Sequence, residues 1–383
     1  MTDSAPPLPP PDDRVQASPL KGRGTATRLL HRFARDQREV VDDGWSTGWA
    51  EDGEAEPTEA VPTQVTHEHA KTILARNESP DLPFTWSVNP YRGCEHGCIY
   101  CYARPTHSYL NLSPGLDFET RLVAKVNAAD CLRRELAKPS YVPSAINLGS
   151  ATDCYQPVER ELGITRSVLE VLTQCEHPFS IVTKSSGVER DLDLISLAAQ
   201  RQQALVLVSI TTLDSALCRK LEPRAAAPHR RLLTVKRLAA AGVPVGVNVA
   251  PIIPFLNEPE IEHIIAAAAE AGAGSIHYTV VRLPWEVNPL FQEWLQHHVP
   301  DRAARIMARI RDMRGGKDYD ANFASRMRGS GLWAELIAQR VAKASARHGL
   351  SRRAVALDIS RFKPPGVIRA ATADTSPEQG SLF

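Results

Sequence analysis

The chain lacks both an excess of charge and a long apolar run. Its 383 residues contain 45 lysines and arginines against 44 aspartates and glutamates, which gives a formal net charge of +1. This balance excludes a globally basic nucleic-acid coat protein and an acidic disordered chaperone. The longest apolar stretch, residues 242–256, contains three prolines and Asn248, so it is too interrupted to cross a bilayer. We therefore expect no membrane segment.

The amino-terminal region lacks the marks of a secretory signal and of a folded domain. It opens on prolines at positions 6, 7, 9, 10 and 11 rather than on a cationic segment followed by an apolar one, so we expect a cytoplasmic protein. Residues 1–75 are rich in proline, glycine, serine and threonine and have almost no sustained periodicity. This composition predicts a mostly disordered leader.

From about residue 80, short β-branched runs alternate with segments of helical periodicity, which is typical of βα repeats. The expected strands are residues 84–89, 144–149, 179–183, 204–210, 244–250 and 275–281. Their nearly continuous apolar character indicates buried parallel strands. We predict an α/β fold with a partial (β/α)6 TIM-like barrel over residues 80–300, in preference to a doubly wound sheet.

The remainder of the chain is expected to lie outside this barrel. Residues 301–365 are basic and have a helical pattern, which predicts a helical C-terminal extension. Residues 366–383 are predicted to form a flexible tail.

Three of the seven cysteines form the pattern Cys94-x3-Cys98-x2-Cys101. Gly93 and Gly97 allow the tight loop that would bring three sulfur atoms together. Thiolates at such close range repel one another unless a cation holds them. Three cysteines can bind three irons of a 4Fe-4S cluster and leave the fourth iron open to a substrate or cosubstrate.

A zinc site is the competing interpretation of these cysteines. His96 or His107 would then supply the fourth ligand, and the chain would be a zinc-stabilised, non-enzymatic nucleic-acid-binding protein. The sequence has no second Cys-x2-Cys pair of the kind that zinc modules usually contain. An electron-transfer protein, with a cluster but without cosubstrate cleavage, is a further alternative.

The cysteine pattern, with Tyr100 before its third cysteine and βα repeats after it, resembles the radical SAM superfamily. Several further stretches resemble its spore photoproduct lyase-like branch: residues 21–24, 89–107, 113–120, 149–153, 183–185, 221–224 and 314–317. The resemblance implies a 4Fe-4S cluster on Cys94, Cys98 and Cys101 whose open iron binds S-adenosylmethionine. Reductive cleavage would give a 5′-deoxyadenosyl radical that abstracts hydrogen from a substrate that remains to be identified.

The resemblance also suggests which residues bind the cosubstrate. It places Tyr100 near the adenine, the turn that starts at Gly149 near the methionyl amine, and Lys184 near the carboxylate or ribose. The full predicted set is Tyr100, Gly149, Ser150, Thr152, Lys184, Ser209 and Arg224. A plain turn at Gly149 and a structural ion pair for Arg224 are the alternatives.

Cys154, directly after the predicted turn, is a candidate hydrogen donor to a product radical, with a buried core cysteine as the alternative. An external one-electron reductant such as flavodoxin or ferredoxin is implied by the resemblance. A nucleic-acid substrate is a hypothesis from family proximity and from the basic C-terminal region, where Arg314 and Lys317 are candidate phosphate contacts.

Overall fold

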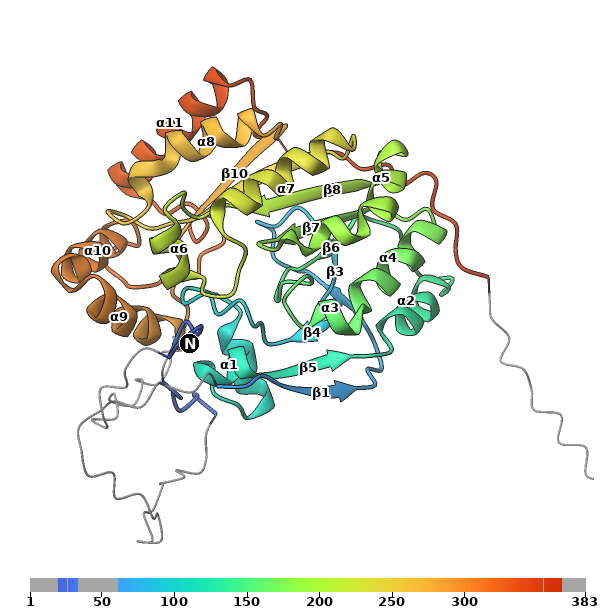
Figure 1. Ribbon diagram of the computed structural model, residues 1–383, viewed down its shortest axis with the longest axis horizontal. Coiled ribbons are helices and arrows are strands. Elements are labelled where there is room, and N and C mark those ends of the chain that lie inside the picture. Colours follow the sequence, from blue (N-terminus) through green and yellow to red (C-terminus); the bar gives the residue numbers. More distant parts are fainter. Residues whose placement is uncertain (1–19, 26, 34–60, 354, 367–383) are drawn as a thin grey trace, which may run out of the picture.

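The main sheet has seven strands in the order β10-β9-β8-β7-β6-β3-β2 (Figure 1). The computed structural model describes residues 20–25, 27–33, 61–353 and 355–366. Six strands are parallel, and only β2 pairs antiparallel, with β3. The strands are β2 (Leu74–Arg76), β3 (Trp86–Val88), β6 (Ile146–Leu148), β7 (Phe179–Thr183), β8 (Ala204–Ser209), β9 (Val245–Ile252) and β10 (Ser275–Val280).

The six parallel strands confirm the six that the sequence predicts. They lie side by side in chain order, from β3 to β10, without a reversal. A doubly wound sheet would reverse its strand order at a switch point, so this order is that of a barrel wall. Because β2 and β10 are the terminal strands of the sheet within the described residues, the wall is open and corresponds to a partial (β/α)6 barrel.

Helices cover the outer face of this wall and enclose the main apolar core (Figure 1). Their apolar stripes pack on strand residues such as Val206, Val247 and Ile276, which are 0 to 1% exposed. The helical segments are α2 (Ala128–Leu136), α3 (Glu159–Leu162), α4 (Ile164–Gln174), η2 (Ser186–Asp191), α5 (Leu192–Gln200), α6 (Ser215–Leu221), α7 (Pro228–Ala240), η3 (Glu258–Glu260) and α8 (Ile261–Glu270).

A second, three-stranded sheet has no counterpart in the sequence prediction. Strand β5 (Arg121–Lys125) lies between β1 (Gln64–Glu68), which is parallel to it, and β4 (Tyr91–Arg92), which is antiparallel. Two helical segments, η1 (Arg104–Leu110) and α1 (Leu116–Thr120), precede β5 in the chain. This small sheet lies beside the segment that carries the three cysteines.

The predicted leader is only partly within the described residues. Residues 1–19, 26 and 34–60 lie outside them, and for these residues the disordered leader stays a prediction. Within the remaining part of residues 1–75, both β1 and β2 are regular strands. The first 75 residues therefore contribute to both sheets, which their composition does not indicate.

The C-terminal region is helical, as the sequence predicts. It contains α9 (Val287–His298), α10 (Pro300–Asp312) and α11 (Gly331–Arg347). Residues 367–383, the predicted tail, lie outside the described residues, and the division of the chain at residues 300 and 365 stays a prediction. Among the described residues, no helix combines the length and the apolar character that a membrane crossing requires.

The outer core should dominate stability, and Ile181 on the central strand β7 tests this. Its side chain is fully buried, whereas Val142 in a connecting segment is 72% exposed. We expect Ile181→Ala to lower the free energy of unfolding by about 2–5 kcal/mol and Val142→Ala to change it by less than about 0.5 kcal/mol. Urea unfolding followed by tryptophan fluorescence measures both, and equal shifts would contradict the assignment of the core.

Candidate active site

The three cysteines lie in one loop after β3, at the carboxyl end of the first parallel strand. Gly93 and Gly97 have φ angles of 79° and 66°, which residues with a side chain adopt only rarely. A Cβ atom on Gly93 would lie 2.8 Å from the His107 ring, and one on Gly97 would lie 2.8 Å from the Glu119 carboxylate. The loop therefore requires glycine at both positions, in agreement with the sequence prediction.

A buried ion pair fixes the backbone of this cysteine loop. Arg104 and Glu119 have fully buried side chains, and their charged groups are 2.5 Å apart. Arg104 also donates hydrogen bonds to the carbonyl oxygens of Gly97 and Cys98, at 3.2 and 3.0 Å. A guanidinium has five donors in a rigid plane, so one side chain holds the loop and neutralises the carboxylate.

The amino-terminal segment packs on the same ion pair. The Gly24 N–H donates to Glu119 at 2.9 Å, and Arg23 donates to the Glu119 carbonyl oxygen at 3.0 Å. A Cβ atom on Gly24 would lie 1.8 Å from the carbonyl oxygen of Gly97, so only glycine fits. The motif at residues 21–24 is thus explained by packing against the cysteine loop.

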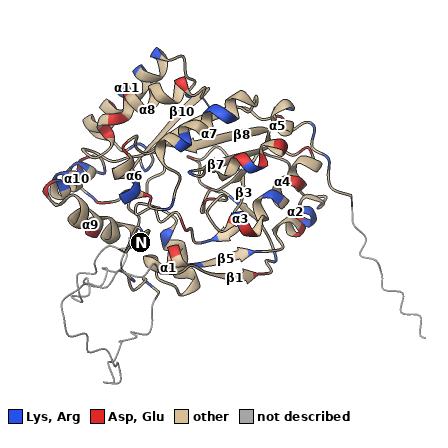
Figure 2. Ribbon diagram, in the orientation of Figure 1, with Lys and Arg blue, Asp and Glu red and all other residues tan. Residues whose placement is uncertain are grey.

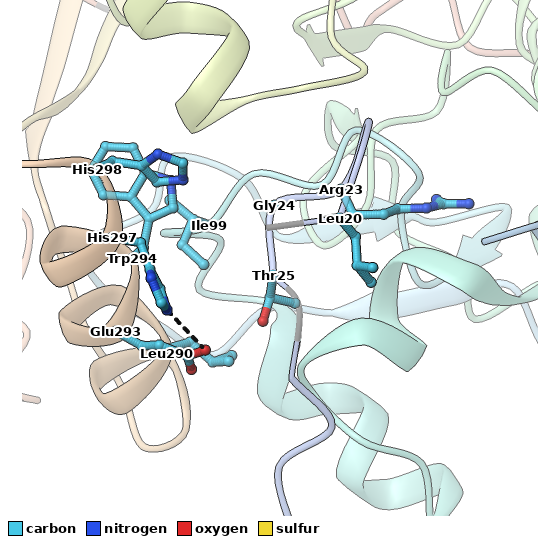
Figure 3. A pocket seen from close by; sticks show the side chains of 10 residues that line it. All are labelled: Leu20, Arg23, Gly24, Thr25, Ile99, Leu290, Glu293, Trp294, His297 and His298. Atoms are coloured by element: carbon cyan, nitrogen blue, oxygen red, sulfur yellow. Dashed lines mark ion pairs between the residues drawn. The ribbon is translucent and has the colours of Figure 1, made fainter. Parts of the chain in front are cut away.

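Beside this contact lies a small cavity between residues 20–25, Ile99 and helix α9 (Figure 3). Its volume is about 20 Å³, which suffices for little more than one water molecule. It is too small to be a cosubstrate site.

The cysteine side chains are close together and largely buried. Cys94 and Cys98 are 7% and 9% exposed, and Cys101 is half-buried. Burial raises the pKa of Cys94 and of Cys98, and the neighbouring cysteines raise both further. Such thiols ionise readily only when a cation stabilises the thiolates, as the metal ions of a cluster do.

The described residues contain no group of three or more His, Cys, Asp or Glu side chains that could hold a metal ion as they stand. In a 4Fe-4S cluster, each cysteine binds a different iron, so three sulfur atoms need not converge on one point. His107, one candidate fourth zinc ligand, is engaged with the Arg121 carbonyl oxygen at 2.9 Å. His96, the other, lies 3.3 Å from Asp153.

The turn after β6 lies next to the cysteine loop. Asn89, five residues before Cys94, donates to the Ser150 hydroxyl at 3.0 Å and accepts from the Ala151 N–H at 2.9 Å. Gly149 has a φ of 87°, and a Cβ atom there would lie 2.4 Å from the Val182 carbonyl oxygen. Hydrogen bonds of Asn89 therefore join the predicted turn after β6 to the segment that follows β3.

Asp153 completes this turn and links it to β7. It accepts hydrogen bonds from the Thr183 hydroxyl at 2.8 Å and the Lys184 N–H at 2.7 Å. Burial opposes its ionisation, but His96 and the backbone N–H groups of Lys184 and Tyr155 outweigh burial and lower the pKa of Asp153 to about 2. A permanent carboxylate therefore joins the cysteine loop to two parallel strands.

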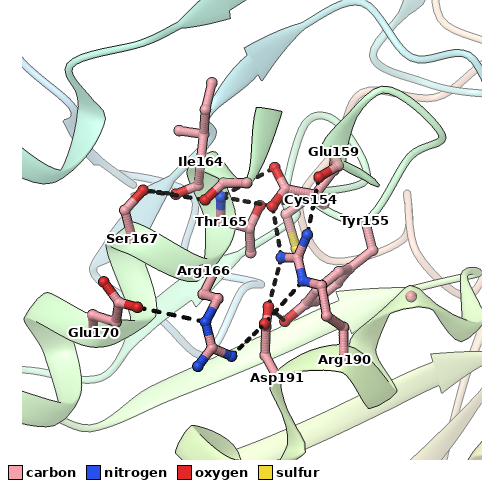
Figure 4. Close-up of polar contacts among 12 residues, drawn as sticks. Cys154, Tyr155, Glu159, Ile164, Thr165, Arg166, Ser167, Glu170, Arg190 and Asp191 are labelled. Atoms are coloured by element: carbon pink, nitrogen blue, oxygen red, sulfur yellow. Dashed lines mark hydrogen bonds and ion pairs between the residues drawn. The ribbon is translucent and has the colours of Figure 1, made fainter. Parts of the chain in front are cut away.

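Beyond this turn, a second polar network anchors the segment that follows Cys154 (Figure 4). Tyr155 donates to Asp191 at 3.0 Å, and Arg190 forms an ion pair with Glu159 at 2.7 Å. Cys154 itself is fully buried in the main core, and burial raises the pKa of its thiol well above the ordinary value. This is the environment of a core cysteine, and the hydrogen-donor role stays a prediction.

Tyr100 binds a buried carboxylate, and Lys184 lies over the face of the Tyr100 ring. Tyr100 donates to Glu222, which also accepts from Thr211 at 2.5 Å and pairs with Arg231. The Lys184 ammonium lies 5.8 Å from the centre of the Tyr100 ring. Burial is the largest effect and lowers the pKa of Lys184, but Cys98 and Glu222 together outweigh it, so the pKa is raised. Lys184 is therefore a cation near the cysteine loop.

The remaining predicted cosubstrate residues are Thr152, Ser209 and Arg224. Thr152 is buried and donates to the Tyr91 carbonyl oxygen at 3.3 Å. Ser209 is 3% exposed at the carboxyl end of β8. Arg224 forms an ion pair with Glu95 at 3.1 Å, which matches the structural alternative that the sequence left open. The cosubstrate roles of all these residues stay predictions.

Several residues that shape the site were missed by sequence reasoning. They are the half-buried Asn89 and the buried charged side chains Arg104, Glu119, Glu222 and Arg231. Asn89, Arg104, Glu119 and Glu222 lie within the resembling stretches 89–107, 113–120 and 221–224, which carried the available signal. Nothing in the sequence shows that these charged residues or Arg231 are buried, because charged groups are rarely fully buried without a partner.

Comparison with known proteins agrees with the fold and the cysteine loop. The sequence profile of the Radical SAM superfamily matches residues 88–268. The uncharacterized protein Rv2578c of Mycobacterium tuberculosis is 35% identical over 271 residues, which cover 69% of this chain and 80% of that protein. The uncharacterized protein MJ0683 of Methanocaldococcus jannaschii is 28% identical over 214 residues, which cover 56% of this chain and 76% of that protein.

Solved structures show the same fold at lower identity. A mutant of spore photoproduct lyase aligns with a TM-score of 0.50 and 15% identity, covering 75% of this chain and 80% of the lyase chain. At this identity the likeness shows the fold alone. A parallel, barrel-type sheet with a three-cysteine loop after its first strand defines a class of cluster-dependent enzymes, and the chain belongs to the radical SAM superfamily. Enzymes of this superfamily use a 4Fe-4S cluster and S-adenosylmethionine for radical chemistry.

The depressed pKa of Asp153 predicts a pH-dependent contribution to stability. A carboxylate with a lowered folded-state pKa stabilises the fold above its unfolded pKa and loses this effect as the pH falls through the folded value. The change from 3.8 to about 2 corresponds to about 2 kcal/mol. We expect Asp153→Asn to lower the free energy of unfolding by this amount at pH 7.

Denaturant unfolding of parent and variant at several pH values checks this expectation. The difference should shrink as the pH falls from 4 towards 2. Asp130→Asn is the matched control, because its side chain is 71% exposed, and we expect an effect below about 0.5 kcal/mol. A difference for Asp153→Asn that does not depend on pH would show that the ionised Asp153 carboxylate is not its cause.

Proposed function

We propose that this enzyme holds a 4Fe-4S cluster on Cys94, Cys98 and Cys101 and cleaves S-adenosylmethionine reductively to start hydrogen abstraction from a substrate. The observation that carries this proposal is the largely buried cysteine loop at the carboxyl end of the parallel wall, held by Arg104. In barrels of parallel strands, active sites lie at this end.

The residues of the site fit such a cluster. When bound, it supplies the electron that breaks the carbon–sulfur bond of the cosubstrate. Cys94 and Cys98 are buried and Cys101 is half-buried beside them, so bound cations would stabilise the thiolates. Lys184 adds a positive charge beside Cys98, which partly offsets the thiolate charge.

Other side chains of the chain would orient the cosubstrate. The turn of Gly149, Ser150 and Thr152 presents small polar groups next to the loop, which suits an amino or carboxylate group. The ring of Tyr100, fixed by Glu222, offers an apolar surface for an adenine. Enzymes of this superfamily also need an external one-electron reductant, and a flavodoxin or ferredoxin would serve.

Removing any one of the three cysteines should abolish the cluster. We expect Cys94→Ala, Cys98→Ala and Cys101→Ala each to lose nearly all iron and acid-labile sulfide after anaerobic reconstitution, and to form no 5′-deoxyadenosine with dithionite. Cys175→Ala is the matched control, because this buried cysteine caps α4 away from the loop, and it should keep both properties.

Other outcomes of this experiment would favour the alternatives. Zinc at about one per chain without iron would indicate the zinc-stabilised, non-enzymatic protein. An intact cluster without any 5′-deoxyadenosine would indicate an electron-transfer protein. Either result would overturn the proposal.

For the substrate, we propose a nucleic acid. Charges of both signs are interspersed along the outer helices (Figure 2), and Arg314 of the basic C-terminal region is 3% exposed and donates to the Val281 and Ser325 carbonyl oxygens. Arg314 is thus a structural residue rather than a phosphate contact. The support for a nucleic acid comes from a different surface.

Within the part of the chain that the structure describes, all five exposed aromatic side chains lie against an arginine. Arg32 lies 4.4 Å from the ring centre of Trp285, and Arg282 lies 4.6 Å from that of Tyr102. We call this set the aromatic–arginine surface; it comprises Phe33, Tyr102, Tyr109, Trp285 and Phe323 with Arg32, Arg282 and Arg326.

This surface adjoins the site, because Tyr102 directly follows Cys101 and Arg282 follows β10. Exposed aromatic rings are groups on which unpaired bases stack. Arg32 and Arg326 are paired with Glu286 and Asp81 at 2.9 and 2.6 Å, so Arg282 is the arginine of this surface that has no carboxylate partner among the described residues. Trp285 has a φ of 46° and is 52% exposed, and such a strained, exposed aromatic residue is typical of a functional position.

Trp285→Ala should weaken the binding of single-stranded DNA. Stacking contributes about 1–3 kcal/mol per base, so we expect the dissociation constant of a twelve-residue oligodeoxynucleotide to rise about 5- to 150-fold. Leu332→Ala is the control, since Leu332 is 73% exposed on α11 and should leave affinity unchanged. Fluorescence anisotropy at fixed salt measures both, and equal affinities for the two variants would rule out this surface.

A further inference from the structure

A second buried side chain holds the cysteine loop, in the half of the loop that Arg104 does not reach. Gln156, which is fully buried, accepts a hydrogen bond from the Glu95 N–H at 2.9 Å and donates to the Gly93 carbonyl oxygen at 3.2 Å. A primary amide has a donor and an acceptor side by side. The side chain of Gln156 therefore binds both peptide groups of Cys94, one on either side of its Cα atom.

These two hydrogen bonds have no substitute in the protein. Among the described residues, neither the Gly93 carbonyl oxygen nor the Glu95 N–H forms another hydrogen bond with a protein group. Buried backbone groups normally have a partner, and one without a partner destabilises the conformation that buries it. The backbone conformation at Cys94 thus depends on the amide of Gln156.

The segment around Gln156 and the start of the cysteine loop bind each other reciprocally. Glu95 accepts a hydrogen bond from the Val158 N–H at 2.8 Å, and Tyr91 donates to the buried Glu159. Arg190 in turn forms an ion pair with Glu159 at 2.7 Å (Figure 4). The amide of Gln156 is therefore carried by a segment that is itself fixed, and a fixed segment can hold the loop in one position.

The Cys94 sulfur lies against the same segment of the chain. Burial has the largest effect and raises the pKa of this thiol, whereas the backbone N–H groups of Asp153 and His96 act in the opposite direction. An N–H group that points at a sulfur atom stabilises the thiolate. Asp153 lies one turn before Gln156, whose own N–H donates to the Asp153 carbonyl oxygen at 3.3 Å. One short turn thus both holds the backbone of Cys94 and faces its sulfur.

We propose that Gln156 is a positioning residue that holds both peptide groups of Cys94 and thereby sets the reduction potential of the cluster. This inference rests on the proposed function, because it requires the cluster that the three cysteines would bind. Hydrogen bonds to cluster sulfurs are among the factors that set a reduction potential. They favour the reduced state, which carries one more negative charge. Gln156 acts only through Cys94, so its loss should make the cluster harder to reduce.

The test variant must keep the volume of the side chain. The wall of a cavity of about 240 Å³ includes Gln156 and also the exposed Arg160, so this cavity opens to solvent. A small residue at position 156 would extend the cavity towards the loop, and solvent exposure alone changes a cluster potential. Gln156→Leu removes both hydrogen bonds at similar volume and avoids this second effect.

A potentiometric titration of the anaerobically reconstituted full-length protein, followed by electron paramagnetic resonance, measures the effect. We expect Gln156→Leu to bind iron and sulfide like the parent and to have a more negative midpoint potential. At the parent's midpoint potential, the ratio of reduced to oxidised cluster should fall about 2- to 12-fold, which corresponds to the loss of one net hydrogen bond. The resonance spectrum of the reduced cluster should change as well.

Gln203→Leu is the matched control. Gln203 is 1% exposed, and its amide donates to the Glu176 carbonyl oxygen at 2.5 Å, next to the amino end of β8. This variant also loses a buried amide that binds the backbone, but at the end of the barrel opposite the cysteine loop. It should keep the parent's potential and spectrum even if its free energy of unfolding is lower. A purely structural role of Gln156 would affect stability alone, as in this control.

An unchanged potential and spectrum in Gln156→Leu would overturn the proposal, and so would an equal shift in Gln203→Leu. If Gln156→Leu binds no iron, Gln156→Asn takes its place, because the shorter amide cannot span both peptide groups. A shift in the same direction would then support the proposal, and the parent's potential would overturn it. A parent that binds no iron would overturn the proposed function itself, and the iron analysis shows this separately.

Discussion

The geometry of the site depends on one buried ion pair, that between Arg104 and Glu119. Both side chains are fully buried, and removing either partner would leave an uncompensated charge in the interior, at a cost of about 3–5 kcal/mol. Arg104 binds two carbonyl oxygens of the cysteine loop, and Glu119 binds the backbone of Gly24. Three segments that are far apart in the chain thus meet at a single pair of charges.

Around this pair, each of the two sheets holds one side of the cysteine loop. The small sheet, with the segment of residues 20–25, covers one side of the cysteine loop, and the parallel wall provides the other. Asp153 connects the two, because it contacts His96 in the loop and Lys184 at the end of β7. The cysteines are therefore held by rigid elements on both sides, which is the condition for a cluster to bind in a defined orientation.

Electrostatics and polarity change from the loop to the interior of the barrel. Near the cysteines, the half-buried Lys184 and the buried pair of Glu222 and Arg231 carry charges of both signs. Farther along the last three strands, the inner face carries uncharged polar groups, while the rim carries Arg282 against the exposed ring of Tyr102.

The sequence by itself determined the six parallel strands and the cysteine loop. These features are local, because strand periodicity, a tight three-cysteine spacing and the glycines at positions 93 and 97 all lie within short windows. Only the tertiary structure decided that β1 pairs with β5, more than fifty residues later, and that Arg104, Glu119 and Glu222 are buried. A charged residue has the same local appearance at the surface and in the core, and its burial depends on a partner that the chain supplies from a distant segment.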